Sequence, residues 1–289
     1  MYNLTDISTV KDILARHGFH FSKALGQNFI INPSICPRMA EESGIDGNCG
    51  VIEIGAGIGV LTAELAKRAK KVVVIEIDTK LLPILDETLK DFDNIEIINQ
   101  DVLKTDLAAL IKEKFDGMPV YVCANLPYYI TSPVIMALLE SRLPIEAITV
   151  MVQKEAAQRL CAAVGSRLSG AVTVAVDYYA KAEKLFDVSA GSFMPAPKVD
   201  SSVIRMEIRK EPEIKITNEE LFFRMVHAAF GQRRKTASNS ISAGSGIPKD
   251  VVIKAIEECG FQPSVRAESL TMEELASLSE KINGLLINC

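Results

Sequence analysis

Short apolar segments alternate with amphipathic segments along the first part of the chain. Five apolar runs have the length of buried strands: residues 51–54, 72–75, 95–98, 120–124 and 147–152. A helical pattern follows each of them, at residues 60–65, 80–90, 107–115, 134–139 and 153–160. Strands and helices that alternate in this way predict a doubly wound parallel sheet. Further helices are expected at residues 9–17, 33–43 and 169–179, and two antiparallel strands at residues 183–188 and 201–209.

The pattern becomes purely helical in the last part of the chain. Residues 210–215 are charged and contain Pro212, which is typical of a linker. Helical spacing follows at residues 219–230, 236–242, 248–259 and 271–287. We therefore predict two domains: an α/β domain over residues 1–210 and a small all-helical C-terminal domain over residues 211–289.

A glycine turn follows the first predicted strand of the sheet. Gly55, Gly57 and Gly59 are preceded by an acidic strand residue, Glu53. Glycines permit a tight turn and close approach of the backbone to a ligand. Dinucleotide sites favour the spacing G-x-G-x-x-G, whereas G-x-G-x-G after an acid is typical of S-adenosylmethionine sites. A single glycine turn is weak support for either cofactor.

Acidic side chains also end the next two predicted strands. Glu76 lies about twenty residues after the turn, where an acid can bind both ribose hydroxyls of a nucleotide-like cofactor. It could equally be a surface carboxylate. Asp101 can accept a hydrogen bond from an adenine amino group, or it can serve only as a turn residue. We expect Asp78 to cap the helix at residues 80–90.

The segment Asn125-Leu126-Pro127-Tyr128 follows the fourth predicted strand. The carboxyl edge of such a sheet is where ligands bind. The Asn125 oxygen and the backbone carbonyls that Pro127 holds in place suit an exocyclic amine, which donates two N–H groups. Tyr128 offers a face on which a flat base can stack. The competing interpretation is a plain strand-to-helix turn, since Asn and Pro are common in turns.

Three other segments allow both a structural and a functional interpretation. Residues 21–30 place the polar Gln27 and Asn28 between apolar neighbours, as in a loop packed at both sides. Phe193 lies on a proline-stiffened loop and is either a core residue or a second stacking face. The basic cluster Arg233-Arg234-Lys235 is either a solvated surface or a phosphate-binding site.

Composition excludes several classes of protein. The chain has 289 residues and a formal net charge of −5 at pH 7, so any nucleic-acid site must be a local basic patch. No apolar run has the length of a membrane span, and the N-terminus lacks a signal-type core. We therefore expect a cytoplasmic protein. The six cysteines and three histidines form no zinc pattern, so we expect no metal site.

Taken together, these motifs resemble the ribosomal RNA adenine N6-dimethyltransferase family over nearly the whole chain, and within it the enzymes that modify the small subunit. The motifs that carry the resemblance are, in order, residues 23–29, 53–59 with 61–62, 76–78, 100–101, 125–128, 153–155, 193–201 and 229–236. Each motif is common alone, but the ordered set is specific. Gln100 departs from the family, where glycine is frequent. The related macrolide-resistance enzymes lack the Gln-Arg-Arg-Lys stretch at residues 232–235.

The resemblance implies a Rossmann-like methyltransferase sheet that binds S-adenosylmethionine. Gln27, Asn28 and the backbone near Ile30 would close over the methionine end of the cofactor, and Gly55 and Gly57 would approach it by their backbone. The other implied roles are ribose binding by Glu76, packing of the cofactor adenine on Ile77, binding of its amino group by Asp101, and a bridge from cofactor to substrate by Asn125. Leu126, Pro127, Tyr128 and Phe193 would complete the catalytic site. Lys198, Arg233, Arg234 and Lys235 would contact RNA.

The implied activity is transfer of methyl groups to N6 of two adjacent adenines in a 3'-terminal hairpin of small-subunit (16S) ribosomal RNA. The implied partner is the immature small ribosomal subunit, and no heptad pattern suggests more than a monomer. Two alternatives remain. One is an adenine N6-methyltransferase that acts on DNA or on another nucleic acid; Leu126 and the C-terminal motif disfavour the DNA enzyme. The other is a ribosome assembly factor whose binding matters more than catalysis.

Overall fold

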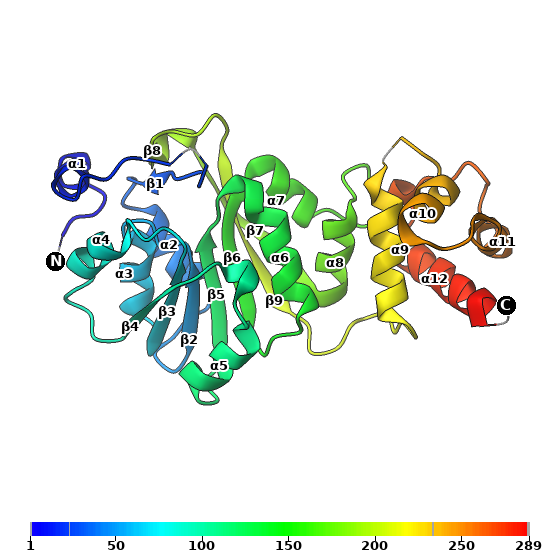
Figure 1. The fold of residues 1–289 in the computed structure, drawn as a ribbon, viewed down its shortest axis with the longest axis horizontal. Helices are drawn as coiled ribbons and strands as arrows, with labels where there is room; N and C mark the ends of the chain where they lie inside the picture. Colours follow the sequence, from blue (N-terminus) through cyan, green and yellow to red (C-terminus); the bar gives the residue numbers. More distant parts are fainter. Residues whose placement is uncertain (1, 23, 233, 288–289) are drawn as a thin grey trace. The chain divides into compact units, whose positions relative to one another are not determined.

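The computed structural model describes residues 2–22, 24–232 and 234–287 (Figure 1). By its internal contacts the chain divides into two compact units. The first comprises residues 1–157 and 182–208, and the second comprises residues 158–181 and 209–289. Among the described residues, no helix combines the length and the apolar character that crossing a bilayer requires.

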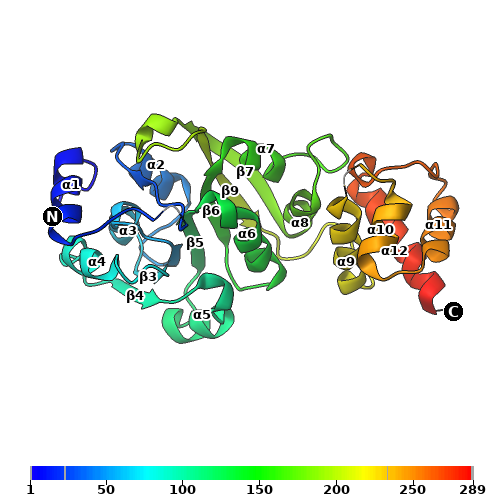
Figure 2. The same cartoon turned by 45° about the horizontal axis from the view of Figure 1, so that its top comes forward.

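The first unit is built on a seven-stranded sheet with the strand order β4-β3-β2-β5-β6-β9-β7 (Figures 1 and 2). The strands β2 to β6 run parallel, and β9 is antiparallel to β6. The bounds of the strands are β2 Gly50–Ile54, β3 Lys71–Glu76, β4 Ile95–Asn99, β5 Val120–Asn125, β6 Ala147–Gln153, β7 Ala180–Val188 and β9 Ser201–Ile208. The predicted parallel sheet and its two additional strands are therefore confirmed.

Two helices of the first unit precede β2, and the others follow these strands along the chain. They are α1 Ile7–Arg16, α2 Ile35–Glu42, α3 Val60–Ala66, α4 Leu82–Thr88, α5 Leu107–Phe115, α6 Thr131–Glu140 and the start of α7 Lys154–Leu160. Strand side chains alternate between the two faces of the sheet. Val51, Val72 and Val74 pack in one core with residues of α1 to α4, while Ile52 and Val73 are buried on the opposite side. Burial on both faces explains the continuous apolar runs in the sequence.

The strand order places a topological switch point between β2 and β5. From β2 the chain proceeds outward to β3 and β4, and then returns to form β5 on the other side of β2. Ile54 of β2 lies opposite Ala124 of β5 in the register. The glycine turn and Asn125 therefore begin side by side at the carboxyl ends of neighbouring strands. This is the position at which open α/β sheets bind ligands.

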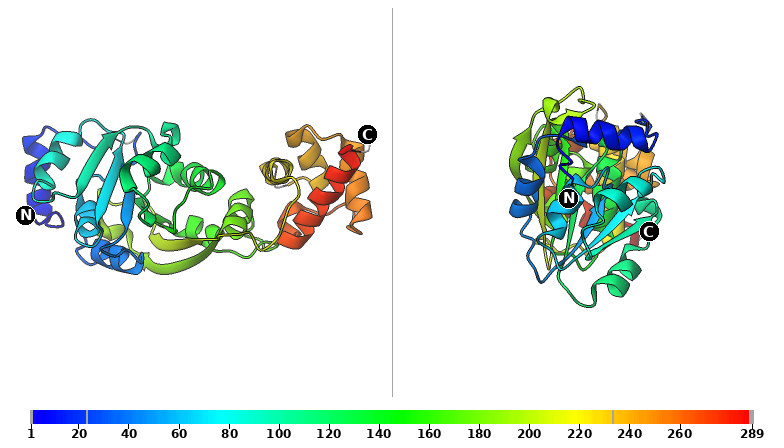
Figure 3. Two further views of the ribbon diagram at one scale, coloured as in Figure 1. Left: turned by 90° about the horizontal axis from the view of Figure 1, so that it is seen from below. Right: turned by 90° about the vertical axis from the view of Figure 1, so that its left-hand side faces the viewer.

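A second, two-stranded sheet joins distant parts of the first unit. Strand β1 (Phe29–Ile30) pairs with β8 (Phe193–Met194), and Ile30 lies opposite Phe193. The sequence predicted only an extended loop around residues 191–200. The pairing fixes Phe193 against the N-terminal segment. Helix α1 lies beside α4, and Arg16 Nη2 is 2.8 Å from Glu87 Oε1; both helices are at the N-terminal end of the molecule in Figure 1 and in the left view of Figure 3.

The second unit is helical. Its helices are α8 Ala171–Tyr179, α9 Glu219–Gly231, α10 Ala237–Ser245, α11 Lys249–Glu258 and α12 Met272–Ile287, and the last four pack together (Figure 2). The predicted boundary near residue 210 differs from this division, because residues 158–181 belong to the helical unit. Tyr178 of α8 explains the difference: its ring contacts Phe222 and Phe223 of α9, and its hydroxyl donates to Glu219 at 2.8 Å.

Candidate functional site

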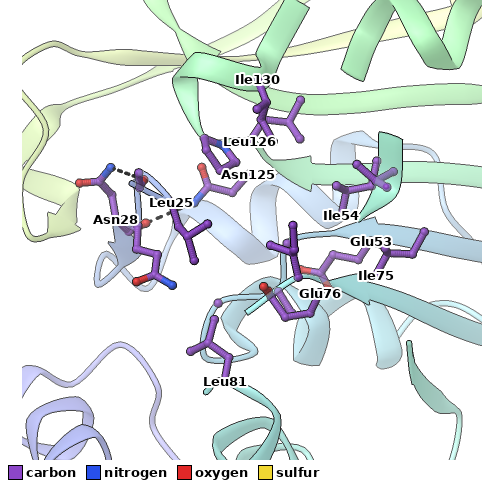
Figure 4. A pocket seen from close by; sticks show the side chains of 18 of the residues that line it. Leu25, Asn28, Glu53, Ile54, Ile75, Glu76, Leu81, Asn125, Leu126 and Ile130 are labelled. Atoms are coloured by element: carbon purple, nitrogen blue, oxygen red, sulfur yellow. Dashed lines mark hydrogen bonds between the residues drawn. The ribbon is translucent and has the colours of Figure 1, made fainter. Parts of the chain in front are cut away.

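A cavity of about 280 Å³ opens at the carboxyl edge of the sheet in the first unit (Figure 4). Its walls come from the N-terminal loop, from the ends of β2, β3, β4 and β5, and from Phe193. All predicted cofactor residues line it: Gln27, Asn28, Ile30, Gly55, Gly57, Glu76, Ile77, Asp101 and Asn125. The predicted catalytic residues Leu126, Pro127, Tyr128 and Phe193 line it as well. The predicted cofactor-binding residues and the predicted catalytic residues therefore line the same cavity.

The glycine turn presents backbone to the cavity. Gly55, Gly57 and Gly59 have φ angles of 75°, 58° and 91°, which residues with a side chain rarely adopt. A Cβ atom added to Gly55 would meet nothing within 4 Å, so this position faces open space. A Cβ atom on Gly59 would lie 2.9 Å from Leu89 Cδ2, because α3 begins there close to α4. Gly55 therefore leaves room for a ligand, whereas Gly59 allows the two helices to approach.

Glu76 ends β3 with its carboxylate almost fully buried in the cavity wall, 4% exposed. Its Oε1 accepts a hydrogen bond from the Asp78 backbone N–H at 2.9 Å. Burial raises the pKa of the Glu76 carboxyl, and the backbone donors around it oppose this shift. Glu76 is therefore an oriented acceptor inside the cavity, and the interpretation as a plain surface carboxylate is wrong.

Ile77 and Asp101 stand at the same side of the cavity as Glu76. The Ile77 side chain is 52% exposed although it is apolar, so it offers an open surface for packing. Asp101 accepts the Leu103 N–H at 3.0 Å and thereby caps the short 3₁₀ helix Val102–Lys104. Its other carboxylate oxygen lies 3.8 Å from Lys104 Nζ. Asp101 is thus a turn residue that also lines the cavity.

Glu53 is a buried acid that the sequence identified only as part of the glycine motif. It is 1% exposed, lines the cavity, and its Oε2 has no hydrogen-bond partner among the described residues. Burial raises the pKa of Glu53 to about 8, and the nearby Glu76 carboxylate adds to the increase. An unpaired buried carboxyl is costly unless a donor or a cation meets it. The cavity therefore offers a buried carboxyl that a hydrogen-bond donor or a cationic group of a ligand would stabilise.

The N-terminal loop (residues 24–30, ending in β1) is tied to the sheet on two sides. The Gln27 Nε2 amide donates to Asp78 Oδ2 at 2.6 Å, and Gln27 Oε1 accepts the Ser22 N–H at 2.8 Å. On the other side, Asn125 Nδ2 donates to the Asn28 carbonyl at 3.4 Å (Figure 4). The loop is therefore held between Asp78, the second residue after β3, and Asn125, the last residue of β5.

Asp78 does not cap a helix, and the prediction that it does was wrong. Helix α4 begins at Leu82, its N-cap position is Leu81, and no side chain caps it. Asp78 instead accepts the Lys80 N–H at 3.0 Å through Oδ1, which leaves Oδ2 for Gln27. The predicted position failed because the helix starts two residues later than its apolar spacing indicated. The carboxylate holds the N-terminal loop.

The segment Asn125-Leu126-Pro127-Tyr128 is held rigidly at the end of β5. Leu126 is buried, and its N–H donates to the Met151 carbonyl of β6 at 3.3 Å. The Ile130 N–H donates to the Pro127 carbonyl at 3.1 Å in the 3₁₀ helix that follows, Tyr128–Ile130. By contrast, the Leu126 carbonyl and the Asn125 side-chain oxygen have no partner in the part of the chain that the structure describes. Two acceptors thus remain available at the cavity.

The two predicted stacking residues are fixed by different contacts. The Tyr128 hydroxyl shares a hydrogen bond with Ser201 Oγ at 2.7 Å, and burial raises the pKa of this phenol. Phe193 is only 4% exposed and belongs to the hydrophobic core, yet it also lines the cavity. The two interpretations of Phe193 are therefore compatible, because one part of the ring packs and another faces the cavity.

The predicted RNA-binding residues lie outside the cavity lining. Lys198 is exposed on the loop between β8 and β9 in the first unit. Arg234 and Lys235 are exposed after α9 in the second unit, and Arg233 lies outside the described residues. Within the described ranges, no group of acidic, histidine or cysteine side chains is arranged to hold a metal ion.

Sequence reasoning missed two lining residues, Tyr129 and Gln100, and two long-range hydrogen bonds that shape the site. Tyr129 lines the cavity and is 58% exposed; its position directly after Tyr128 was the available signal. The Gln27 bond to Asp78 and the Tyr128 bond to Ser201 join residues 51 and 73 positions apart. No pattern among neighbouring residues in the sequence predicts hydrogen bonds over such distances. Gln100, where the resembling family often has glycine, also lines the cavity.

Comparison with known proteins gives concordant results. A family model described as ribosomal RNA adenine dimethylase matches residues 18–283. A ribosomal RNA small subunit methyltransferase A from Geobacillus thermodenitrificans (strain NG80-2) is 49% identical over 289 residues, which cover 97% of this chain and 98% of that protein. The crystal structure of a dimethyladenosine transferase from Plasmodium falciparum has a TM-score of 0.71 at 25% identity, covering 89% of this chain and 98% of that one. The 23S rRNA methyltransferase ErmE has a TM-score of 0.65 at 28% identity, covering 89% and 100%.

Proposed function

The chain belongs to the ribosomal RNA adenine dimethylase family, and from this premise we propose that it dimethylates N6 of two adjacent adenines in a 3'-terminal hairpin of small-subunit (16S) ribosomal RNA. The family's methyl donor is S-adenosylmethionine, and the product is N6,N6-dimethyladenosine. One observation carries the choice of the small subunit: the relative named for that subunit is similar over 97% of this chain, including the helical unit. We further propose the immature small subunit as the partner and a monomer as the active form.

The cavity is suited to S-adenosylmethionine on two structural grounds. The unpaired Oε2 of Glu53 and the buried carboxyl of Glu76 would be stabilised by the donor and cationic groups of a ligand, and the cofactor carries ribose hydroxyls, a sulfonium and an ammonium group. Gly55 leaves open space where a side chain would stand. When bound, the cofactor supplies an electrophilic methyl group.

In this proposal, different residues of the cavity bind different parts of the cofactor. Glu76 accepts hydrogen bonds from the ribose hydroxyls, since its carboxylate is held in place by the Asp78 N–H. Ile77 packs on the cofactor adenine with its exposed side chain, and Asp101 accepts from the adenine amino group. Gln27, Asn28 and the backbone near Ile30 close over the methionine end as parts of the tethered N-terminal loop.

Asn125 and Leu126 orient the amine that is methylated. The amide nitrogen of Asn125 is engaged by the Asn28 carbonyl, so its oxygen is the group that faces a donor. This oxygen and the Leu126 carbonyl accept the two N–H groups of adenine N6 and favour a localised lone pair. Leu126 suits this role better than Pro127, whose carbonyl already accepts the Ile130 N–H. Tyr128 and Phe193 hold the base, which must leave its stack to reach them.

No strong general base is needed for this chemistry. As the methyl group bonds to N6, the nitrogen becomes positively charged and its proton becomes acidic, so water can accept it. Most of the acceleration then comes from alignment of the reacting atoms, which can contribute about 7–11 kcal/mol. Consistent with this, the buried acid Glu53 serves binding in our proposal, not proton transfer.

Methyl transfer to small subunits tests the proposal directly. Small ribosomal subunits from a strain that lacks the modification are incubated with the protein and tritiated S-adenosylmethionine, and the labelled nucleosides are identified. We expect N6,N6-dimethyladenosine at two adjacent positions. Label in large subunits, label in another nucleoside, or no label in the presence of bound cofactor would contradict the proposed substrate. Binding of S-adenosylhomocysteine is measured by calorimetry as a control. If the protein binds it but labels no subunits, the proposed substrate is wrong; if it does not bind, the cofactor site is not functional.

A further inference from the structure

Tyr129 is a large, exposed aromatic residue at the cavity that the roles above leave unused. It is 58% exposed and lines the same cavity as Asn125 and Tyr128. The other exposed apolar residues of the lining, Ile77 and Leu103, follow β3 and β4 on the side proposed for the cofactor. Tyr129 follows β5 and stands on the side proposed for the substrate.

The ring of Tyr129 is supported from one side. A Cβ atom added to Gly26 would lie 3.4 Å from Tyr129 Cε1 and 3.5 Å from Cδ1, so the ring lies over the glycine of the N-terminal loop. The Tyr129 hydroxyl has no hydrogen bond to any residue that the structure describes, whereas the Tyr128 hydroxyl is bonded to Ser201. Both consecutive tyrosines line the cavity, but Tyr128 is fixed by a hydrogen bond, whereas Tyr129 is more than half exposed.

We propose that the Tyr129 ring is a stacking platform for the base next to the target adenine, and that it helps to select the nucleotide context of the target. This inference rests on the proposed function. Turning the target base out of its stack deprives the neighbouring base of a stacking partner. An aromatic ring at the mouth of the cavity replaces that partner and holds the strand while the target enters.

Two substitutions separate stacking from packing. Tyr129→Phe keeps the flat ring, while Tyr129→Leu keeps apolar bulk over Gly26 without a stacking face. Ile7→Ala, at an exposed apolar residue of α1 that does not line the cavity, is the control. Each variant is assayed for kcat and KM with small subunits that lack the modification, and for its Kd for S-adenosylhomocysteine by calorimetry.

We expect Tyr129→Leu to lower kcat/KM for the subunit by roughly five- to 150-fold, mainly through KM, since this is the effect of losing one stacked base. Tyr129→Phe and the control keep the wild-type values, and the Kd for S-adenosylhomocysteine stays unchanged in all three. An unchanged KM in Tyr129→Leu would overturn the proposal. So would a parallel loss of cofactor affinity, which would show that the ring only supports the N-terminal loop. A wild-type protein inactive on subunits would instead refute the proposed function itself.

Discussion

At the scale of single residues, Asn125 joins the N-terminal loop to the position proposed for the substrate amine. Its amide nitrogen donates to the Asn28 carbonyl, and its oxygen is unengaged among the described residues. Because one end of the side chain donates and the other end can accept, a carboxamide suits the position better than a carboxylate. A carboxylate would lose the donor and would place a charge against a carbonyl oxygen.

Asn125→Ala should lower methyl transfer by about 10²- to 10³-fold, as expected when one positioned hydrogen-bond partner at a reacting atom is removed. RNA binding should remain close to that of the wild type, because the phosphate contacts lie elsewhere in our proposal. Single-turnover methylation and filter binding measure the two effects separately. Asn48→Ala, at an exposed asparagine before β2, is the matched control. Full activity of Asn125→Ala would remove this residue from the mechanism.

Glu53 makes stability depend on pH in an unusual direction. Its pKa rises from 4.5 to about 8 on folding because the carboxyl is buried. Between these values the folded protein holds a proton that the unfolded chain has lost, so the free energy of unfolding falls as pH rises. The change is about 1.4 kcal/mol per pH unit for one proton. Below the lower value both states are protonated, and the effect vanishes.

Glu53→Gln removes this titration and should remove its contribution to the pH dependence. Relative to the wild type, the cofactor-free variant is expected to gain stability as pH rises between the two pKa values, by up to a few kcal/mol. Urea unfolding of both proteins at several pH values measures the difference. Glu113→Gln, at an exposed carboxylate of α5, should leave the pH dependence unchanged. Parallel pH profiles for the wild type and Glu53→Gln would show that Glu53 is already ionised when folded.

At the scale of elements, the N-terminal loop closes one side of the cavity without being part of the large sheet. It is held by the Gln27–Asp78 bond, by the Asn125–Asn28 bond and by the pairing of β1 with β8. These three contacts tether the loop where it lines the cavity. The strength of each tether therefore contributes to cofactor affinity.

Gln27→Ala and Asp78→Ala should each weaken binding of S-adenosylhomocysteine by about two- to tenfold, the equivalent of one net hydrogen bond. The double variant should bind no more weakly than the single variants, because both remove the same interaction. Calorimetry provides the dissociation constants. Asp93→Ala, at an exposed aspartate before β4, serves as the control. Additive losses in the double variant would show that the two residues act independently.

At the scale of the whole molecule, the proposed cofactor site and part of the proposed RNA-binding surface lie in different compact units. The cavity is formed entirely by residues of the first unit, while Arg234 and Lys235 belong to the second. The chain as a whole is acidic, with a net charge of −5, so affinity for RNA must come from local basic positions. Chemistry and RNA binding should therefore be separable by mutation.

Reversal of Arg234 and Lys235 to Glu should weaken RNA binding and reduce its dependence on salt. The slope of log K against log salt should fall by about 0.7 for each phosphate contact that is lost on single-stranded RNA. Titration of the 3'-terminal hairpin at several KCl concentrations measures the slope, and S-adenosylhomocysteine binding should be unaffected. The matched control reverses Lys249 and Lys254, two exposed lysines of the same unit. An equal effect of both double variants would indicate general electrostatics without a defined site.

The sequence by itself determined the order of elements and the residues that end the strands. Apolar runs bounded by helical patterns predicted the parallel sheet, because these periodicities depend on neighbours a few positions apart. Glu76 and Asn125 end their strands and Asp101 follows one, and parallel strands bring such residues to one edge. That they line a common cavity could therefore be anticipated. Their chemical roles came from the family resemblance and remain proposals.

Only the tertiary structure decided which distant residues meet. Asp78 was predicted to cap a helix and instead holds Gln27, because the start of α4 and the path of the N-terminal loop are set by packing. Residues 158–181 belong to the helical unit because the Tyr178 ring packs on α9. The raised pKa of Glu53 likewise follows from burial by chain segments far away in sequence. Local periodicity contains no information on such contacts, since they depend on how completed elements pack against one another.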